Sequence, residues 1–256
     1  MQFAQISFTS TRGYMKVAIL ISGQPRNFER GYEELKEAYL SKYDCDIFYH
    51  TWDSWSFEAT QFFKDRPANK YNMVHGWKEE LALTYKAITS EVELPKVFDN
   101  QNIVDTMWRQ PLQNSKSMWY SVMKSFALTN PGYDVYIRTR FDLRYEPSVT
   151  DLSKLDLNKL HVWDWDTDSR VKHRGLYDVF AIGTYETIGI YSSLFQKMDW
   201  YLKYDIEYKK FLQGGWPGQD SGLRNEYLLR WHLLQAGVPV EIHPNTIPHA
   251  DGHIIR

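Results

Sequence analysis

The distribution of apolar residues predicts a strand at residues 16–22, because five apolar side chains follow one another there without a polar interruption. A run of this kind is typical of a parallel strand that is buried on both faces. Asn27 is expected to cap a following helix, whose apolar positions recur at helical spacing: Phe28, Tyr32, Leu35 and Tyr39. A second strand is expected at residues 46–51, and it would complete a β–α–β unit.

Residues 52–114 are polar, aromatic and weakly periodic, so we expect a mixed insertion of helix and loop there, with one helix at about residues 78–89. The pattern favours a clearer helix at residues 117–128, which an Asn-Pro-Gly sequence terminates. Three apolar side chains share one face of this helix: Met118, Val122 and Phe126. A strand is expected next, at residues 133–138.

Two more strands are predicted at residues 160–163 and 178–182, on either side of a charged segment. The last helix is expected at residues 221–236, with one apolar stripe formed by Leu223, Tyr227, Trp231 and Leu234. A glycine and a proline stop it before a final strand at residues 238–242. Strands and helices in this alternation predict an α/β fold with a mainly parallel central sheet flanked by helices.

The composition fits one large globular domain, since the chain has 256 residues, of which 43% are hydrophobic and 24% charged. The formal charge of −2 gives no bulk electrostatic reason to expect unmodified nucleic acid as the main partner. Cys45 is the only cysteine, which excludes an intramolecular disulfide and favours a reducing compartment such as the cytoplasm, including that of an infected host cell. Residues 1–14 are expected to be an extension that is neither a secretory signal nor a membrane anchor.

Ligands of an open parallel sheet bind outside the carboxyl ends of its strands. The first such end offers backbone N–H groups, a hydroxyl and a guanidinium, which suit a phosphate or a base: Ser22, Gly23, Gln24 and Arg26. A plain strand-to-helix turn is the alternative. The second end is the sequence His-Thr-Trp before Asp53, where the indole would stack on a base and the carboxylate would bind a ribose. The alternative there is a packed tryptophan with Asp53 as a helix cap.

The third strand end carries Arg138, Arg140 and Asp142. Two arginines and one aspartate within five residues at a buried strand end cost free energy unless they bind a ligand or pair with each other. As a ligand site, the arginines would bind a diphosphate, and Asp142 would bind either a divalent metal or the ribose of a donor. An internal pair of arginine and aspartate is the alternative.

The order of these motifs resembles that of glycosyltransferases of the GT-A fold, with the small viral and bacterial capsule-type sugar transferases as the nearest parallel. The motifs are Val17-Ala-Ile-Leu-Ile-Ser-Gly-Gln-Pro-Arg26, Asp46-Ile-Phe-Tyr-His-Thr-Trp-Asp53, a Trp-Tyr-Ser helix and Tyr133-Asp-Val-Tyr-Ile-Arg-Thr-Arg-Phe-Asp142, with weaker echoes at 178–183 and 225–229. The resemblance implies a Rossmann-like GT-A sandwich. We expect one domain at residues 15–256, with a nucleotide-binding half at 15–145 and an acceptor-side half at 146–256.

In the GT-A fold this strand-end loop usually carries Asp-x-Asp, whose carboxylates hold Mn²⁺ or Mg²⁺ against the donor diphosphate. Here Arg140 stands in place of the first aspartate and only Asp142 remains. The arginines would then neutralise the diphosphate themselves, and metal dependence stays open. A late histidine often completes the metal shell in such enzymes, and His249 or His253 would match it, unless these residues belong to an ordinary tail.

Transfer also requires a carboxylate on the acceptor side of the sugar. Asp178 starts a strand, Asp220 lies at the start of a helix, and Glu226 lies one turn further in. An N-cap role for Asp220 and an i,i+4 pair of Glu226 with Arg230 are the ordinary alternatives. Residues 163–168, with two indoles and three carboxylates, would suit an acceptor-binding loop or a solvated turn.

The leading hypothesis is therefore an enzyme that moves a sugar from a nucleoside diphosphate sugar to a hydroxyl. Arg138 and Arg140 would aid departure of the diphosphate, with a metal at Asp142 as an open addition. The acceptor stays open between a glycan, a lipid-linked glycan, a protein and a hydroxymethylated base in phage DNA. Two other classes are a sugar-phosphate nucleotidyltransferase, which normally has a Gly-rich loop after the first strand, and a non-catalytic nucleotide- or glycan-binding module. Loss of the first acid of the metal motif is the best support for the module.

Overall fold

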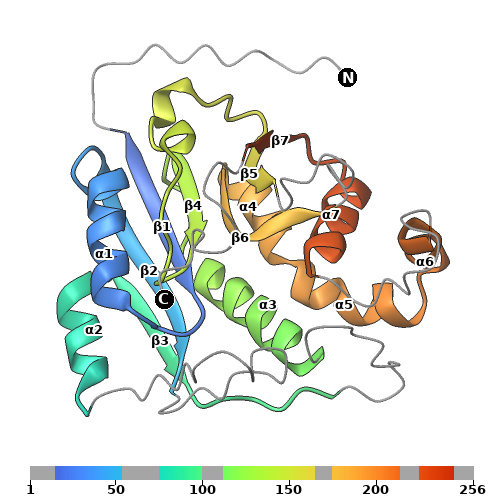
Figure 1. Cartoon of the computed structure of the whole chain (residues 1–256), viewed down its shortest axis with the longest axis horizontal. Coiled ribbons are helices and arrows are strands. Elements are labelled where there is room, and N and C mark those ends of the chain that lie inside the picture. Colours follow the sequence, from blue (N-terminus) through green and yellow to red (C-terminus); the bar gives the residue numbers. More distant parts are fainter. Residues whose placement is uncertain (1–14, 54–74, 100–111, 165–174, 214–224, 245–256) are drawn as a thin grey trace.

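The computed structural model describes residues 15–53, 75–99, 112–164, 175–213 and 225–244. Its strands form one seven-stranded sheet in the order β3-β2-β1-β4-β6-β5-β7 (Figure 1). The strands are β1 (Lys16–Ser22), β2 (Asp44–Trp52), β3 (Thr89–Glu93), β4 (Val135–Thr139), β5 (Leu160–Asp164), β6 (Leu176–Gly183) and β7 (Val240–His243). All neighbours are parallel except that β6 runs antiparallel to β4 and to β5. The predicted α/β fold with a mainly parallel central sheet is confirmed.

Helices cover both faces of the sheet (Figure 1). They are α1 (Phe28–Leu35), which continues into the π-helical turn η1 (Lys36–Leu40), α2 (Trp77–Tyr85), α3 (Leu112–Ala127), the 3-10 turns η3 (Pro147–Val149) and η4 (Leu152–Lys154), α4 (Tyr185–Ser192), α5 (Leu194–Lys203), α6 (Ile206–Gln213) and α7 (Asn225–Gln235). The buried side chains of α1 and α2 join one core cluster, and those of α3, α4, α5 and α7 join the other. No helix in the described part of the chain combines the length and the apolar character needed to cross a membrane.

Strand β1 lies in the interior of the sheet, between β2 and β4, as its apolar run predicts. Val17, Ile19 and Ile21 contribute to the core on the α1 face, whereas Ala18 and Leu20 contribute to the core on the α3 face. All five side chains are fully buried, because helices cover both faces of this strand.

The expected helix at residues 78–89 is wrong at its carboxyl end, because α2 stops at Tyr85 and Thr89 begins strand β3. β3 pairs only with β2 at the edge of the sheet, and its side chains are exposed or half-buried. An edge strand of this kind needs no apolar run, so hydrophobic periodicity does not reveal it. Asn27 does occupy the N-cap position of α1, but with a left-handed backbone and no capping hydrogen bond from its side chain.

Two helices have wider buried surfaces than predicted. In α3, which begins already at Leu112, Val122 is buried as expected, and Met118 and Phe126 are partly buried against the same core, to which the fully buried Trp119 also belongs. In α7, Trp231 is buried as expected but Leu234 is 56% exposed, and Leu228, Leu229 and Leu233 complete the buried face. Leu223 lies outside the described residues. α7 packs against β6 and also against α4 and α5, so its buried surface is wider than a single stripe.

The sheet continues without a break from the predicted nucleotide-binding half into the predicted acceptor-side half. The connection is the pairing of β4 with β6, in which Ile137 lies opposite Ile182. The division of the domain near residue 145 stays a prediction. The strands on both sides of that residue belong to the same sheet.

Candidate functional site

The carboxyl ends of β1, β2 and β4 meet at one edge of the sheet, because these strands are parallel neighbours (Figure 1). β6 runs in the opposite direction, so its first residues reach the same edge. Register places Arg138 opposite Ala181, and Asp178 therefore lies beyond the end of β4. The helix after β1 and the helix before β4 cover opposite faces of the sheet, which makes this edge a topological switch point of the kind that binds ligands.

Arg138 connects three strands at this edge. Its side chain is 1% exposed. Its Nη1 donates to the backbone oxygen of Asp178 at 2.5 Å, and its Nη2 donates to Oγ of Ser22 at 3.4 Å. Its Nε has no hydrogen-bond partner among the described residues. Burial lowers the pKa of Arg138, although Tyr191 and Asp178 act against this. A buried cation that keeps an unpaired donor is uncommon and marks this strand end as a candidate ligand-binding position.

Arg140 and Asp142 form a bidentate pair, the internal arrangement that the sequence left as an alternative. Nε of Arg140 lies 2.8 Å from Oδ1 of Asp142, and Nη2 lies 2.9 Å from Oδ2. The side chain of Asp142 is 1% exposed and that of Arg140 is 23% exposed. Burial lowers the pKa of Arg140, but Asp142 more than offsets this, so the net pKa is raised. The pair uses two of the five N–H groups of the guanidinium.

This arrangement does not fit a metal at Asp142. Both carboxylate oxygens already accept hydrogen bonds from Arg140, and the guanidinium would repel a cation held beside it. His249, the proposed metal partner, and His253 lie outside the described residues.

Asp178 is a buried carboxyl beside both arginines. Burial raises its pKa, while Arg138, Arg140 and a hydrogen bond from the side chain of Asn225 act in the opposite direction. Glu226 lies in the same first turn of α7, and this turn contacts the segment before β6, since a Cβ on Gly175 would lie 2.8 Å from Cβ of Glu226. Asp220 and residues 165–168 lie outside the described residues. We call Ser22, Arg138, Arg140, Asp142 and Asp178 the arginine cluster.

Helix α1 fixes the arginine loop from the opposite face. A Cβ on Gly31 would lie 1.6 Å from the backbone oxygen of Phe141, so only glycine allows α1 to approach the loop this closely. Phe141 itself is fully buried and packs edge-on against the rings of Tyr49 and Tyr85. The residues on either side of Phe141 are therefore held in a defined place.

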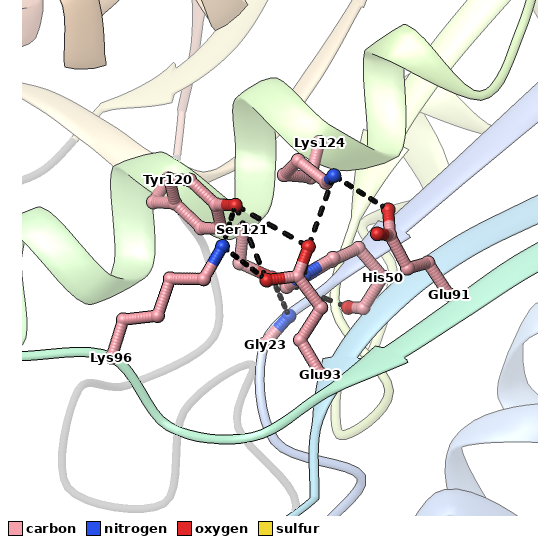
Figure 2. Close-up of polar contacts among 8 residues, drawn as sticks. All are labelled: Gly23, His50, Glu91, Glu93, Lys96, Tyr120, Ser121 and Lys124. Carbon is pink, nitrogen blue, oxygen red and sulfur yellow. Dashed lines mark hydrogen bonds and ion pairs between the residues drawn. The ribbon is translucent and has the colours of Figure 1, made fainter.

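The loop after β1 is held by α3 and β2 (Figure 2). The N–H of Gly23 donates to Oγ of Ser121 at 3.0 Å and to the backbone oxygen of His50 at 3.3 Å. Gly23 has φ of 109°, a conformation that side-chain-bearing residues rarely adopt. Within the loop, Oε1 of Gln24 accepts from Nε and Nη2 of Arg26 at 3.0 and 2.9 Å. The loop is thus anchored at Gly23, next to Ser22 of the arginine cluster.

A second charged group lies at the same edge, and no sequence motif marks it as a unit. We call it the lysine cluster: Glu91, Glu93, Lys96 and Lys124, with Tyr120 between the two lysines (Figure 2). Lys124 lies 2.8 Å from Glu91 and 3.0 Å from Glu93, and Lys96 lies 2.5 Å from Glu93. The two glutamates share one face of β3, so recognition of β3 as a strand would have revealed their convergence.

His50 lies between the two clusters in a buried position. Its Nδ1 lies 2.8 Å from Oγ of Ser121, and its Nε2 lies 3.7 Å from Oε1 of Glu93. Burial lowers the pKa of His50 to about 4, although Glu93 acts against this, so the ring is neutral at neutral pH. For Glu93, burial raises the pKa, but hydrogen bonds from Lys96 and Lys124 outweigh it and bring the pKa to about 2.

Asp53 follows β2 and binds Lys78 of α2, with Oδ2 and Nζ 2.5 Å apart. Trp52 is buried and stacks on Tyr120, with ring centroids 5.5 Å apart. The indole is thus a packed side chain at the end of β2, whereas the half-buried Asp53 remains at the edge of the sheet.

No protein-family model and no curated protein matches the chain. Solved structures similar to it include two glycosyltransferases. One is the apo form of GlyE from Streptococcus pneumoniae TIGR4, at 10% identity and a TM-score of 0.41, over 90% of this chain and 45% of that one. The other is the apo form of mouse xyloside xylosyltransferase 1, at 9% identity and a TM-score of 0.42, over 91% of this chain and 86% of that one. The chain therefore spans less than half of the length of GlyE.

Proposed function

We propose that the chain is a glycosyltransferase that moves a sugar from a nucleoside diphosphate sugar to a hydroxyl acceptor, with a glycan as the first candidate acceptor. The arginine cluster is the observation that carries this proposal. It places two guanidinium groups and a buried carboxyl with a raised pKa at the switch point of the sheet. The guanidinium groups would stabilise a leaving diphosphate, and the carboxyl would accept the proton of an acceptor hydroxyl.

The arginines would stabilise the departing diphosphate. As the bond between the sugar and the phosphate oxygen breaks, its electron pair leaves with the diphosphate and negative charge grows there. Arg140 is held in one orientation by Asp142, and only two of its N–H groups are used in that pair. A guanidinium that is fixed before reaction stabilises the developing charge more than the ground state, which lowers the barrier. No step needs a metal at Asp142.

Asp178 would accept the proton of the acceptor hydroxyl. The new bond forms between the hydroxyl oxygen and the anomeric carbon, while the hydroxyl proton passes to the carboxylate. Burial raises the pKa of Asp178, which brings the carboxyl closer to the range in which a general base works well near neutral pH. Glu226, in the adjacent first turn of α7, is the second candidate for this role.

The donor nucleotide would lie along the loop after β1 and the end of β2. Ser22, Gly23, Gln24 and Arg26 supply a hydroxyl, a glycine backbone and polar side chains next to the arginine cluster. Asp53 would bind the ribose, and a ribose hydroxyl would compete with Lys78 for its carboxylate.

The test is a panel of nucleotide sugars incubated with the purified chain, with free nucleoside diphosphate as the readout. Release that accelerates with an added glycan, or with hydroxymethylated DNA in a parallel arm, supports transfer. Asp178→Asn should lower the rate by at least about 10²-fold while nucleoside diphosphate still binds. Asp151→Asn, at an exposed turn outside the site, is the control and should keep the parent rate. Pyrophosphate exchange would indicate a nucleotidyltransferase, and binding without turnover would indicate a binding module.

A further inference from the structure

Strands β5 and β7 bring together two histidines and a glutamate, away from both clusters described above. The ligand atoms of His161, Glu241 and His243 all lie within 4.8 Å of one another. His161 lies opposite Glu241 in the register of the two parallel strands, and His243 follows two residues later. Nδ1 of His161 and Nε2 of His243 are 2.9 Å apart. Only the order of the sheet brings them together, because the two strands are far apart in the sequence.

The hydrogen bonds of His161 identify the nitrogen that is available as a ligand. Its ring is fully buried, and its Nε2 lies 2.9 Å from the backbone oxygen of Asp156. A carbonyl oxygen only accepts hydrogen bonds, so Nε2 carries the hydrogen and Nδ1 directs a lone pair toward His243. Metal-binding histidines are commonly oriented in this way, with the second ring nitrogen donating to a carbonyl.

The side chain of His243 is buried at 9% exposure, and its Nε2 faces the ring of His161. The position is reachable, since β7 is an edge strand and the side chain of Glu241 is 41% exposed.

We propose that His161, His243 and Glu241 form a site for a divalent transition-metal ion of the Zn²⁺ type. Two imidazole nitrogens and one carboxylate are a ligand set that Zn²⁺ accepts, with water as the fourth ligand. Zn–N bonds of about 2.0–2.1 Å in a tetrahedron place two nitrogens about 3.3 Å apart, so the imidazoles need to separate by only a few tenths of an ångström. The bound ion would fasten the short strand β7 to β5. This inference does not rest on the proposed function.

The ion pair that now holds Glu241 is weak enough to be displaced. Nζ of Lys159 lies 2.9 Å from Oε2 of Glu241, and both side chains are well exposed to water. Such a pair contributes little to stability. His50, Glu91 and Glu93 offer the same types of ligand, but Lys96 and Lys124 already neutralise those two carboxylates at short distances. The lysines therefore supply the positive charge there, and of these two groups in the described part of the chain the one on β5 and β7 is open to a metal.

The experiment titrates the full metal-free chain with Co²⁺, followed by visible absorption, and with Zn²⁺, followed by calorimetry. We expect one high-affinity ion per chain with the absorption of tetrahedral Co²⁺. His243→Gln is the informative variant, because the glutamine amide still donates to Nδ1 of His161 but offers no nitrogen lone pair. It should weaken Zn²⁺ binding at least about 100-fold, since loss of even an outer-shell partner costs 10–100-fold. The melting temperature of the metal-free variant should stay near that of the parent.

Three further variants make the result decisive. Glu241→Gln should also weaken Zn²⁺ binding, whereas Glu207→Gln should not, because Glu207 is an exposed glutamate with a comparable lysine pair at Lys210. The double variant His249→Asn/His253→Asn tests the other late histidines and should bind Zn²⁺ as the parent does. Absence of stoichiometric binding by the parent would overturn the proposal. So would unchanged binding by His243→Gln, or loss of binding in the double variant alone.

Discussion

The arginine cluster and the lysine cluster, both at the carboxyl edge of the sheet, each combine cations with carboxylates, but they differ in how far these side chains are buried. In the arginine cluster, Arg138 and Asp142 are 1% exposed and the bidentate pair fixes Arg140. In the lysine cluster, the side chain of Lys96 is 45% exposed and that of Lys124 is 26% exposed. One cluster is embedded among the strand ends, whereas the other lies between β3 and α3 and faces water.

This difference suits the arginine cluster to stabilising the charge of a ligand and the lysine cluster to holding β3 against α3. A buried guanidinium with a fixed orientation acts in a low dielectric and remains charged, so it can stabilise a second anion strongly. A hydrated ammonium on a flexible chain is screened, and its ion pairs contribute little. We therefore expect substitutions in the arginine cluster to affect transfer, and substitutions in the lysine cluster to affect mainly the attachment of β3.

The largest expected effect comes from Gly31→Ala, which tests whether α1 fixes the arginine loop. The new Cβ would lie 1.6 Å from the backbone oxygen of Phe141, and a backbone atom cannot move aside as a side chain can. We expect the free energy of unfolding to fall by about 3 kcal/mol, measured by urea denaturation.

Gly189→Ala is the matched control, because its Cβ would meet only the ring of Phe126, at 3.0 Å, and a ring can shift. Alanine is also the better helix former by about 0.5–1 kcal/mol, so this variant should stay within about 1 kcal/mol of the parent. Equal losses in the two variants would mean that α1 tolerates displacement from the loop.

Arg140→Lys separates geometry from charge in the arginine cluster. Lysine keeps the positive charge but loses the bidentate contact. The activation free energy should therefore rise by about 2–3 kcal/mol, so that kcat falls roughly 10²-fold, while donor affinity should change less. Steady-state kinetics with the donor identified by the panel measure both. The matched control is Lys124→Arg in the lysine cluster, which should change kcat by less than about threefold. A parent-like kcat in Arg140→Lys would leave Arg140 and Asp142 as a structural pair.

The sequence predicts the buried parts of this fold better than its edge. β1 is apparent because helices on both faces demand an apolar run, and the run from Val17 to Ile21 is such a pattern. β3 has no such requirement, so its polar sequence gave no signal, and the convergence of Glu91 and Glu93 went unnoticed with it. The opposite edge strand, β7, keeps apolar side chains at Val240 and Ile242, and the sequence does predict it. An edge strand is therefore apparent from the sequence only where it keeps apolar residues.

The candidate site shows the same limit. The spacing of Arg138, Arg140 and Asp142 predicts charged side chains at a buried strand end, and they lie there. Whether Asp142 faces Arg140 or a ligand depends on side-chain rotamers, which spacing does not determine. The approach of His161 to His243 depends on the position of β7 beside β5, and no local pattern reports the order of strands.

The next prediction concerns the histidine between the clusters. His50 has a pKa of about 4 in the folded chain, against 6.5 as its ordinary value. As pH falls below 6.5, His50 takes up a proton in the unfolded chain but stays neutral in the folded chain. The free energy of unfolding therefore decreases as pH falls toward 4. Between pH 7 and pH 5 this amounts to about 2 kcal/mol.

His50→Asn tests this contribution, because its amide nitrogen can take the place of Nδ1 beside Ser121 but does not titrate. Urea denaturation at pH 7 and pH 5 should show a smaller loss of stability in the variant than in the parent. Equal losses would mean that His50 is not the group that destabilises the fold in acid.

The smallest expected effect is that of chelation on transfer. If the fixed arginines neutralise the diphosphate, EDTA should leave the initial rate at 25 °C within about twofold of the untreated rate, because Asp142 is occupied by Arg140. Removal of a metal from His161, His243 and Glu241 would lower the melting temperature instead, since that group lies on β5 and β7, away from the arginine cluster. Measuring rate and melting temperature on the same EDTA-treated sample distinguishes the two. A full loss of rate that Mn²⁺ restores would place a metal in the reaction and contradict neutralisation of the diphosphate by the arginines alone.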